Sequence, residues 1–413
     1  MSDRVSALAS HHRALGSDLG DWNGMGVAWS YATDPDDEHD AVRTAAGLFD
    51  LSALKKVHVR GPDALAVVNH IITRDMAKIS PGASAYGPIL TKQGTICDDA
   101  IIFNMGNNEY LVVHGTGDTM ELLQESAEGK NVVIEFDDVL HDLPFQGPKT
   151  VEFLAEHTAM DLSSLGYFQH QETTLFDKKC MLSRTGYSGE RGYEIFANAD
   201  VIVDLWEQIL ERGRPMGIMP CSFTCLDKAR VEAALLFYEG DMTTANTPWE
   251  VGFGWAISRT KGDFRGKEAL FAAEGKEKIK LAGIVAEHDD AVEANSKLLH
   301  NGDEVGVVNS PVYSRRMKKS LALVAYAARL GGARDAPGGE GRKHRLRRDG
   351  GKDPVLRPGK DADPRLGSDG GLDRRGAGEG RLRRTGASPA AETRRGKAKA
   401  APEKVPVFFR IEE

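Results

Sequence analysis

Short stretches of alternating apolar and polar residues are mixed with stretches of helical apolar spacing over the first three quarters of the chain. Residues 56–60 alternate as a β-strand does, and residues 63–73 carry apolar side chains at the spacing of a helix. Further strands are predicted at residues 87–91, 99–104, 109–114 and 132–136, and further helices at 39–46, 118–129, 201–213 and 222–236. Because strands and helices do not alternate one by one, the pattern favours an α+β fold over a doubly wound parallel sheet.

Two later segments are predicted to contain antiparallel hairpins. Residues 180–184 and 193–197 are typical of two strands, and they flank the tight, glycine-containing segment 185–189. Residues 278–323 are rich in strand-forming residues, and the Asn301-Gly302 pair is typical of a hairpin turn. The second segment is therefore predicted to be a separate, barrel-like β-domain.

The sequence changes character after about Leu330. Residues 331–413 hold 16 of the 45 glycines and few large apolar residues outside the stretch Val405–Phe409. Such a composition buries too little apolar surface to offset the entropy of ordering, so this low-complexity tail is predicted to be disordered. The change falls inside an expected barrel strand, and a shift of reading frame in GC-rich coding DNA is one explanation. A disordered tail specific to the lineage is the other.

Charge is distributed unevenly between the body of the chain and this tail. The formal net charge is −8, but residues 331–413 carry 21 Lys and Arg against 13 Asp and Glu, which leaves 32 against 48 in the first 330 residues. The acidic body argues against specific nucleic-acid binding by the folded part. No apolar run reaches about 18 residues, no signal-peptide pattern is present, and four cysteines do not form a disulfide framework. A cytoplasmic protein without a membrane partner is expected.

The first candidate for chemistry is the adjacent pair Asp98 and Asp99 in the segment YGPILTKQGTICDDAII. Successive side chains of a strand point to opposite faces, so the two carboxylates cannot both face one pocket. One is expected on a functional surface, and the other is expected to cap a turn, as aspartates commonly do. A purely structural pair is the alternative.

Two further segments are candidates. In TGYSGERGYEIF, three glycines allow the backbone to approach a flat ligand closely, and Glu194 can accept two parallel N–H bonds from a guanidine-like heterocycle edge. A hairpin with solvated charges is the alternative. In LDKARVEAALLFYEGDM, Arg230 and Glu232 are too close in sequence to face each other on a helix. Each is therefore expected to form an ion pair with another element.

In this order and spacing, the segments resemble the tetrahydrofolate-dependent aminomethyltransferase family, whose type member is the T-protein of the glycine cleavage system. The matching segments lie within roughly residues 20–325: EHDAVRTAAGLFDLS, YGPILTKQGTICDDAII, TGYSGERGYEIF, LDKARVEAALLFYEGDM and TPWEVGFGW with FRGKEAL. The resemblance implies a three-lobed fold. Residues 1–262 would form a two-lobed folate-binding region, 263–328 a truncated C-terminal β-barrel, and 329–413 the tail.

Carried over by position, the resemblance implies roles for individual residues. Asp99 resembles the family's essential aspartate, which lies near N5 and N10 of the pterin, and Asp98 would be its structural neighbour. Tyr86 matches a tyrosine that lines the pterin pocket. Glu194 matches the glutamate that holds the amino-pyrimidine edge.

The remaining predicted folate contacts are Tyr187 and Arg230, and here the sequence departs from the family. Many T-proteins place a folate-contacting arginine immediately before the aspartate that matches Asp227, where this sequence has Leu226. Arg230, one helical turn further on, is predicted to substitute only in part. The second departure is the C-terminus, where the tail replaces the last barrel strands.

The resemblance implies an enzyme that moves one-carbon units to tetrahydrofolate without a metal. The first expectation is an aminomethyltransferase, which takes a methylene group from an aminomethylated lipoyl carrier protein and releases ammonia. The first alternative is a folate-dependent O-, S- or N-demethylase acting on a small methylated donor. The second is a non-catalytic folate-binding scaffold like the iron–sulfur assembly relatives, although their KGCYxGQE-type motif is absent here.

Overall fold

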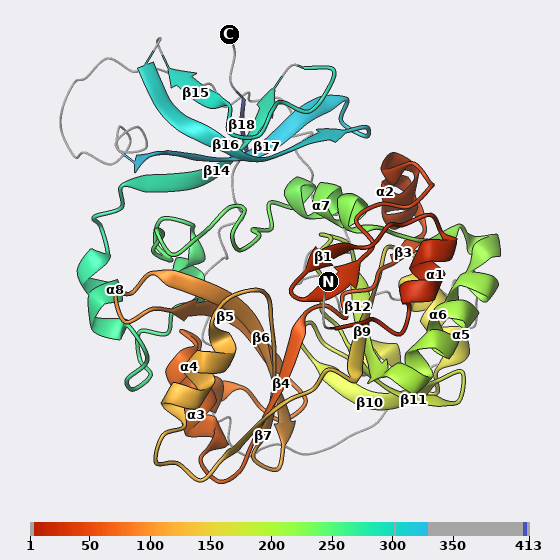
Figure 1. Ribbon diagram of the computed structural model, residues 1–413, viewed down its shortest axis with the longest axis horizontal. Helices are drawn as coiled ribbons and strands as arrows, with labels where there is room; N and C mark the ends of the chain where they lie inside the picture. Colours follow the sequence, from red (N-terminus) through yellow and green to blue (C-terminus); the bar gives the residue numbers. More distant parts are fainter. Residues whose placement is uncertain (1–3, 287, 301–302, 329–407, 411–413) are drawn as a thin grey trace, which may run out of the picture.

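The computed structural model describes residues 4–286, 288–300, 303–328 and 408–410, whose strands form three large sheets in three lobes (Figure 1). The predicted three-lobed α+β fold is confirmed. The turn predicted at Asn301-Gly302 and the tail residues 329–407 lie outside the described residues. Among the described helices, none combines the length and the apolar character that crossing a membrane would require.

The first lobe is an antiparallel five-stranded sheet with two helices packed on one face. Its strand order is β5-β6-β7-β4-β8. The elements are β4 (Lys55–Arg60), α3 (Ala64–Ile71), β5 (Ser84–Leu90), β6 (Ile96–Gly106), β7 (Glu109–His114), α4 (Thr119–Ser126) and β8 (Val133–Phe136). Buried residues of α3 and α4, such as Val67 and Leu123, form one apolar core with Ala100 and Ile102 of β6.

The second lobe is a six-stranded sheet of order β10-β11-β12-β9-β3-β13, in which only the β13–β3 pair is parallel. The elements are β3 (Ala46–Leu48), β9 (Leu140–Gln146), α5 (Thr150–His157), β10 (His170–Leu175), β11 (Lys178–Ser183), β12 (Gly192–Asn198), α6 (Ala199–Gly213) and β13 (Ile218–Pro220). The helices α5 and α6 bury Phe153, Leu205 and Trp206 against one face of this sheet. The predicted hairpin of residues 180–184 and 193–197 is therefore the β11–β12 pair.

The third lobe, at the top of Figure 1, is the predicted barrel-like domain. Its sheet has the order β15-β16-β17-β14-β18, and β18 pairs in parallel with β14 at one edge. The strands are β14 (Ile279–Ala286), β15 (Lys297–His300), β16 (Asp303–Ser314), β17 (Lys319–Ala327) and β18 (Phe408–Arg410). A short strand from the end of the tail thus lies beside the first strand of this lobe.

The remaining elements connect the lobes. They are α1 (Ala9–Ala14), β1 (Gly20–Trp22), β2 (Met25–Val27), α2 (Pro35–Thr44), α7 (Phe223–Glu232) and α8 (Lys267–Ala273). Helix α2 begins four residues before the predicted start, because Asp34 caps it and Pro35 occupies its first turn. Helix α7 ends four residues before the predicted end, where Ala234 takes a left-handed φ of 54°.

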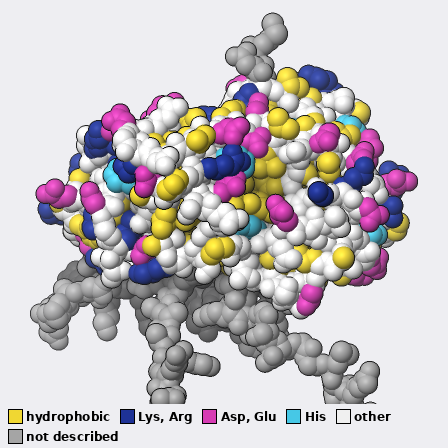
Figure 2. Space-filling view, turned by 90° about the horizontal axis from the view of Figure 1, so that it is seen from below, with side chains coloured by type: hydrophobic (Ala, Val, Ile, Leu, Met, Phe, Trp, Pro, Cys, Tyr) yellow, Lys and Arg dark blue, Asp and Glu magenta, His cyan; other side chains and the backbone are white. Residues whose placement is uncertain are grey.

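The first and second sheets pack face to face through a set of residues that we call the interlobe layer: Phe103, Leu111, Val113, Met181 and Phe196. The rings of Phe103 on β6 and Phe196 on β12 meet edge to face, with centroids 5.5 Å apart. Figure 2 shows the molecule from below, where hydrophobic side chains form small groups among charged ones. The interlobe contact fixes which strand faces of the two sheets oppose each other.

A buried ionic cluster around Glu232 ties α2 and α7 to the third lobe. One carboxylate oxygen of Glu232 accepts hydrogen bonds from His39 Nε2 (2.9 Å) and Arg43 Nη2 (2.8 Å), and the other accepts from Ser314 Oγ (2.6 Å). Burial by itself raises the pKa of Glu232, but the hydrogen bond from His39 and the charge of Arg43 outweigh it and lower the pKa from 4.5 to about 2. The carboxylate form therefore stabilises the contact between α2, α7 and β16.

We predict that Glu232→Gln lowers the free energy of unfolding by about 3 kcal/mol at pH 7, because the buried Arg43 loses its nearer carboxylate partner and keeps only Glu190, at 3.3 Å. The pKa of Glu232 is lower in the folded chain, so its contribution is complete above about pH 4.5 and is lost as pH falls toward about 2. Urea unfolding at pH 7, 4 and 3 measures this. The exposed Glu211→Gln is the matched control, and an equal loss in both variants would contradict the assignment.

Candidate functional site

Asp98 and Asp99 lie side by side on β6 and point to opposite faces of the first sheet, as the alternation predicts. Asp98 is fully buried and hydrogen-bonds with His114 Nδ1 (2.8 Å) and Thr119 Oγ1 (2.5 Å). Thr119 is the first residue of α4, so Asp98 holds that helix against the sheet. The prediction that one of the pair caps a turn is wrong, because both lie inside the strand, opposite Ile89 and Pro88.

Asp99 points toward the second lobe and has an aromatic neighbourhood. The hydroxyl of Tyr86, on β5, donates a hydrogen bond to Asp99 Oδ2 at 2.7 Å. The rings of Phe253 and Trp255 lie 5.8 Å and 6.3 Å from the Tyr86 ring, centroid to centroid. Burial and the negative charge of Asp98 raise the pKa of Asp99 to about 7. This carboxyl group can therefore gain or lose a proton near neutral pH.

Glu194 lies on β12 and points toward the first lobe, as Phe196 does two positions later. Its side chain is buried, and Thr185 Oγ1 donates a hydrogen bond to Oε2. Burial raises the pKa of Glu194 to about 7, against the opposing effect of the Thr185 hydrogen bond. Glu194 is thus a second carboxyl group that changes charge near neutral pH.

The contact between Phe103 and Phe196 brings these two carboxyl groups to opposed surfaces. Asp99 lies four residues before Phe103 on one face of β6, and Glu194 lies two residues before Phe196 on one face of β12. They come from different lobes and are 95 positions apart in the sequence. The structure therefore places Asp99, Tyr86 and Glu194 around the interlobe layer.

The glycines of TGYSGERGYEIF serve packing within the chain. A Cβ atom on Gly186 or Gly192 would collide with the side-chain amide of Gln146. The same amide donates to the carbonyl of Thr185 (3.3 Å) and accepts from Ser188 Oγ (2.8 Å). Gln146 fills the space beside Gly186 and Gly192, and a Cβ atom on Gly189 would meet Ala233, so the prediction that these glycines admit a flat ligand is corrected.

Tyr187 lies near the start of this segment and close enough to Asp99 to feel its charge. Its hydroxyl donates to the carbonyl of Leu236. Burial raises the pKa of Tyr187, the charge of Arg230 opposes this, and the charge of Asp99 adds to it. Its contact with folate stays a prediction. Leu226, which replaces an arginine of many T-proteins, is buried in an apolar cluster that Tyr187 borders.

Arg230 is engaged on all sides within the chain. Its Nε donates to Asp227 (2.7 Å), Nη1 to Asp241 and the Leu235 carbonyl, and Nη2 to Ser310 Oγ (2.9 Å). The expectation that it forms ion pairs beyond its own helical face is confirmed at Asp241. These contacts join α7 to β16 and give Arg230 a structural role, while its contact with folate stays a prediction.

Sequence reasoning missed two buried charged groups next to the interlobe layer. Asp142 on β9 of the second lobe is completely buried and points toward the first lobe. Lys56 on β4 of the first lobe is also completely buried and points toward the second lobe. The sequence signal for Asp142 was an aspartate in the mostly apolar stretch LHDLPF. The aromatic residues Phe253 and Trp255 lie in the segment TPWEVGFGW, whose sequence alone does not indicate that their rings neighbour Tyr86.

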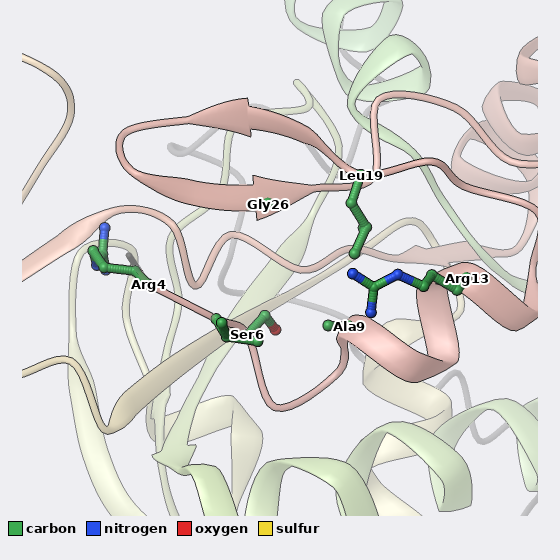
Figure 3. Close-up of a pocket in the computed structure, with 7 residues that line it drawn as sticks. Arg4, Ser6, Ala9, Arg13, Leu19 and Gly26 are labelled. Carbon is green, nitrogen blue, oxygen red and sulfur yellow. The ribbon is translucent and has the colours of Figure 1, made fainter. Parts of the chain in front are cut away.

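A hollow near the start of the chain is a poor candidate for a large ligand. It is lined by Arg4, Val5, Ser6, Ala9, Arg13, Leu19 and Gly26, and the Arg13 guanidinium and Leu19 converge above it (Figure 3). Its volume is about 80 Å³, whereas sites for drug-sized molecules occupy several hundred Å³.

Comparison with known proteins agrees with the predicted resemblance. Residues 8–261 match the family described as the GCVT N-terminal domain. The chain is 46% identical to the "Heme-dependent oxidative N-demethylase gamma subunit" of Ectopseudomonas mendocina, over 78% of this chain and 87% of that protein. It is 33% identical to the "Aminomethyltransferase" of Streptomyces coelicolor, over 82% of this chain and 92% of that protein.

The fold agrees with a solved structure. The glycine cleavage system aminomethyltransferase T from Bartonella henselae superposes with a TM-score of 0.73 at 24% identity, covering 79% of this chain and 90% of that one. At this identity the likeness concerns the fold alone. Together with the family match and the relatives, these findings show that the chain belongs to the GCVT family, the T-protein-like family of folate-dependent one-carbon transferases and demethylases.

Proposed function

We propose that this protein receives one-carbon units on tetrahydrofolate as a subunit of an oxidative N-demethylase. The observation that carries the proposal is the pair of carboxyl groups with raised pKa values, half-buried Asp99 and buried Glu194, that face the interlobe layer from two lobes. The choice of donor is supported by the identity to an N-demethylase gamma subunit, which exceeds the identity to aminomethyltransferases. An oxidised N-methylamine from a partner subunit is the proposed donor.

The residues at the interlobe layer fit a reduced pterin. Glu194 offers a buried carboxylate, which can accept the two parallel N–H bonds of an amino-pyrimidine. The rings of Tyr86, Phe253 and Trp255 lie beside Asp99 and offer flat apolar faces for a bicyclic ring. Asp99 supplies a negative charge at the opposite end from Glu194, where the reacting nitrogens would lie.

In the proposed reaction, the donor is an iminium ion, in which a methylene group is doubly bonded to the positively charged nitrogen of a secondary amine. This methylene becomes the bridge between N5 and N10 of tetrahydrofolate. Both of its bonds to the amine nitrogen break, two C–N bonds to folate form, and the neutral secondary amine leaves. Of the two hydrogens that folate loses, one ends on the amine and one is released as a proton. The Asp99 carboxylate stabilises the cationic carbon and takes that proton, for which a pKa of about 7 is suited.

Aminomethyl transfer is the second candidate, and the relatives named aminomethyltransferase favour it. There the donor is a lipoyl S–CH2–NH3⁺ group on a carrier protein. The thiol and ammonium leave, and the same methylene bridge forms on folate. Asp99 and Glu194 would keep the same roles, because both candidates share the acceptor and differ in the donor.

The donor can be identified by isotope labelling. We expect ¹³C from an N-methyl-labelled tertiary amine, oxidised by the co-expressed N-demethylase subunits, to appear in 5,10-methylene-tetrahydrofolate, detected by mass spectrometry. A carrier protein loaded with a labelled aminomethyl group should give no enzyme-dependent product. Label from the carrier alone would establish the second candidate, and enzyme-independent labelling from both donors would contradict one-carbon transfer.

We predict that Asp99→Asn retains the fold and most of the folate affinity but lowers turnover by about 10²- to 10⁴-fold, because the amide cannot take a proton. The matched control is Asp98→Asn, on the opposite face of the same strand. It should mainly lower the melting temperature, because His114 and Thr119 lose their charged partner. A larger loss of turnover in Asp98→Asn would reverse the assignment of the pair.

The pH profile tests the same residue. Because the pKa of Asp99 is raised to about 7, the reactive carboxylate is lost as pH falls through 7. Turnover at saturating folate should therefore decline below pH 7 in the wild-type protein. The residual activity of Asp99→Asn should show no such decline.

We predict that Glu194→Ala weakens tetrahydrofolate binding by about 1.5–3 kcal/mol, the usual contribution of hydrogen bonds to a charged group. Calorimetry measures the affinity, and Glu172→Ala, an exposed carboxylate on the same sheet, is the control. Wild-type affinity should also fall below pH 7, since the pKa of Glu194 is about 7 and its protonated form accepts fewer N–H bonds. Equal affinities in wild type and Glu194→Ala would remove Glu194 from the site.

A further inference from the structure

Asp142 is a buried carboxyl group for which the described part of the chain supplies no hydrogen-bond partner. Its side chain lies on β9 and is completely buried, and neither Oδ1 nor Oδ2 accepts or donates a hydrogen bond. Buried polar atoms in proteins nearly always have a partner, and leaving one unpaired costs free energy. A group from outside the chain is therefore expected at this position.

Asp142 lies next to Glu194. The strand register pairs Asp142 with Phe196 and Pro144 with Glu194. The two acidic side chains thus share one face of the second sheet as diagonal neighbours, for which Cβ atoms are about 7 Å apart. Both point toward the first lobe, because the residues between them in the register, such as Leu143 and Ile195, belong to the core on the other face.

The other charged groups around Asp142 do not satisfy it. The Lys56 ammonium, on the facing lobe, donates to the carbonyls of Ser52 (2.7 Å) and Leu54 (2.8 Å) and acts on Asp142 through its charge. Burial and the negative charges of Glu194 and Asp50 raise the pKa of Asp142 well above its usual range, and Lys56 opposes them. Burial therefore favours the neutral acid form of Asp142, which has one O–H donor and a carbonyl acceptor.

We propose that Asp142 and Glu194 together bind the two sides of a 2-amino group on a nitrogen heterocycle. Glu194, as a carboxylate, accepts one amino hydrogen and the neighbouring ring N–H. Asp142, as an acid, accepts the other amino hydrogen and donates its O–H to the unprotonated ring nitrogen beside it. The inference rests on the proposed folate function and adds a second recognition residue to it, because the pterin ring carries this arrangement of donors and acceptor.

Replacing Asp142 by an apolar residue is expected to change folate affinity and stability in opposite directions. We measure binding of 5-formyl-tetrahydrofolate by calorimetry and the melting temperature of the ligand-free protein. Asp142→Leu should weaken binding by about tenfold or more, because two hydrogen bonds are lost. It should also raise the melting temperature, because an unpaired buried carboxyl group is replaced by an apolar one. Asp142→Ala provides the affinity test if the leucine variant does not fold.

Amide variants distinguish the two acids. An asparagine amide can accept and donate as a neutral acid does, so Asp142→Asn should bind within about threefold of wild type. A glutamine amide cannot accept two parallel N–H bonds through one group, so Glu194→Gln should bind about tenfold more weakly. This difference between two similar substitutions would not arise from a structural role alone.

Three results would overturn the inference. The first is unchanged folate affinity in Asp142→Leu or Asp142→Ala, which is expected if only an internal water occupies the position. The second is a loss of folate affinity in Asp142→Asn as large as that in Glu194→Gln. The third is a lower melting temperature in Asp142→Leu. If Glu194→Ala weakens binding while Asp142→Leu does not, the folate function stands and only the role of Asp142 falls. If the wild-type protein binds no folate, the proposed function fails and this inference fails with it.

Discussion

Two sheets pack face to face in this protein, and their facing surfaces carry the carboxyl groups of Asp99 and Glu194 as well as buried phenylalanines. The edge-to-face contact of Phe103 and Phe196 joins the sheets. The same burial raises the pKa of Asp99 and of Glu194 to about 7. Desolvation at the interlobe layer therefore both holds the two lobes together and raises the pKa of these carboxyl groups.

Buried polar groups elsewhere fix the elements around this layer. Arg43 links α2 to Glu232 of α7 and, through its Nη1, to the carbonyl of Ser188 (2.7 Å) in the segment before β12. Gln146 occupies the space beside the glycines of that same segment. Because these groups are satisfied within the chain, they hold backbone in place, whereas neither side-chain oxygen of Asp142 has a hydrogen-bond partner in the described part of the chain.

The proposed function separates an acceptor that the family shares from a donor that varies. In the proposed function, Glu194 and the aromatic rings near Tyr86 would recognise the folate, and Asp99 would act in the transfer step. A donor that a partner protein produces would reach this step from outside the two lobes. This division explains how one fold can serve aminomethyl transfer in some relatives and N-demethylation in others.

The sequence alone determined the local structure and part of the site. Periodicity located most strands and helices, and strand alternation separated Asp98 from Asp99, because both depend on neighbouring residues only. The family resemblance supplied Tyr86 and Glu194. The end of α7 escaped this reasoning, since it depends on the left-handed conformation of Ala234.

Only the tertiary structure decided which faces oppose each other. Alternation gives the side of a strand on which a residue lies, but it carries no information on the element that packs there. The partners of Arg230 lie up to 80 positions away along the chain, and those of Glu232 up to 193. In the sequence, Asp142 is one aspartate in a mostly apolar strand. Only the packing around that strand buries its side chain completely and leaves both of its oxygens without a hydrogen-bond partner in the described part of the chain. Its unpaired state results from packing between distant segments, which no local pattern encodes.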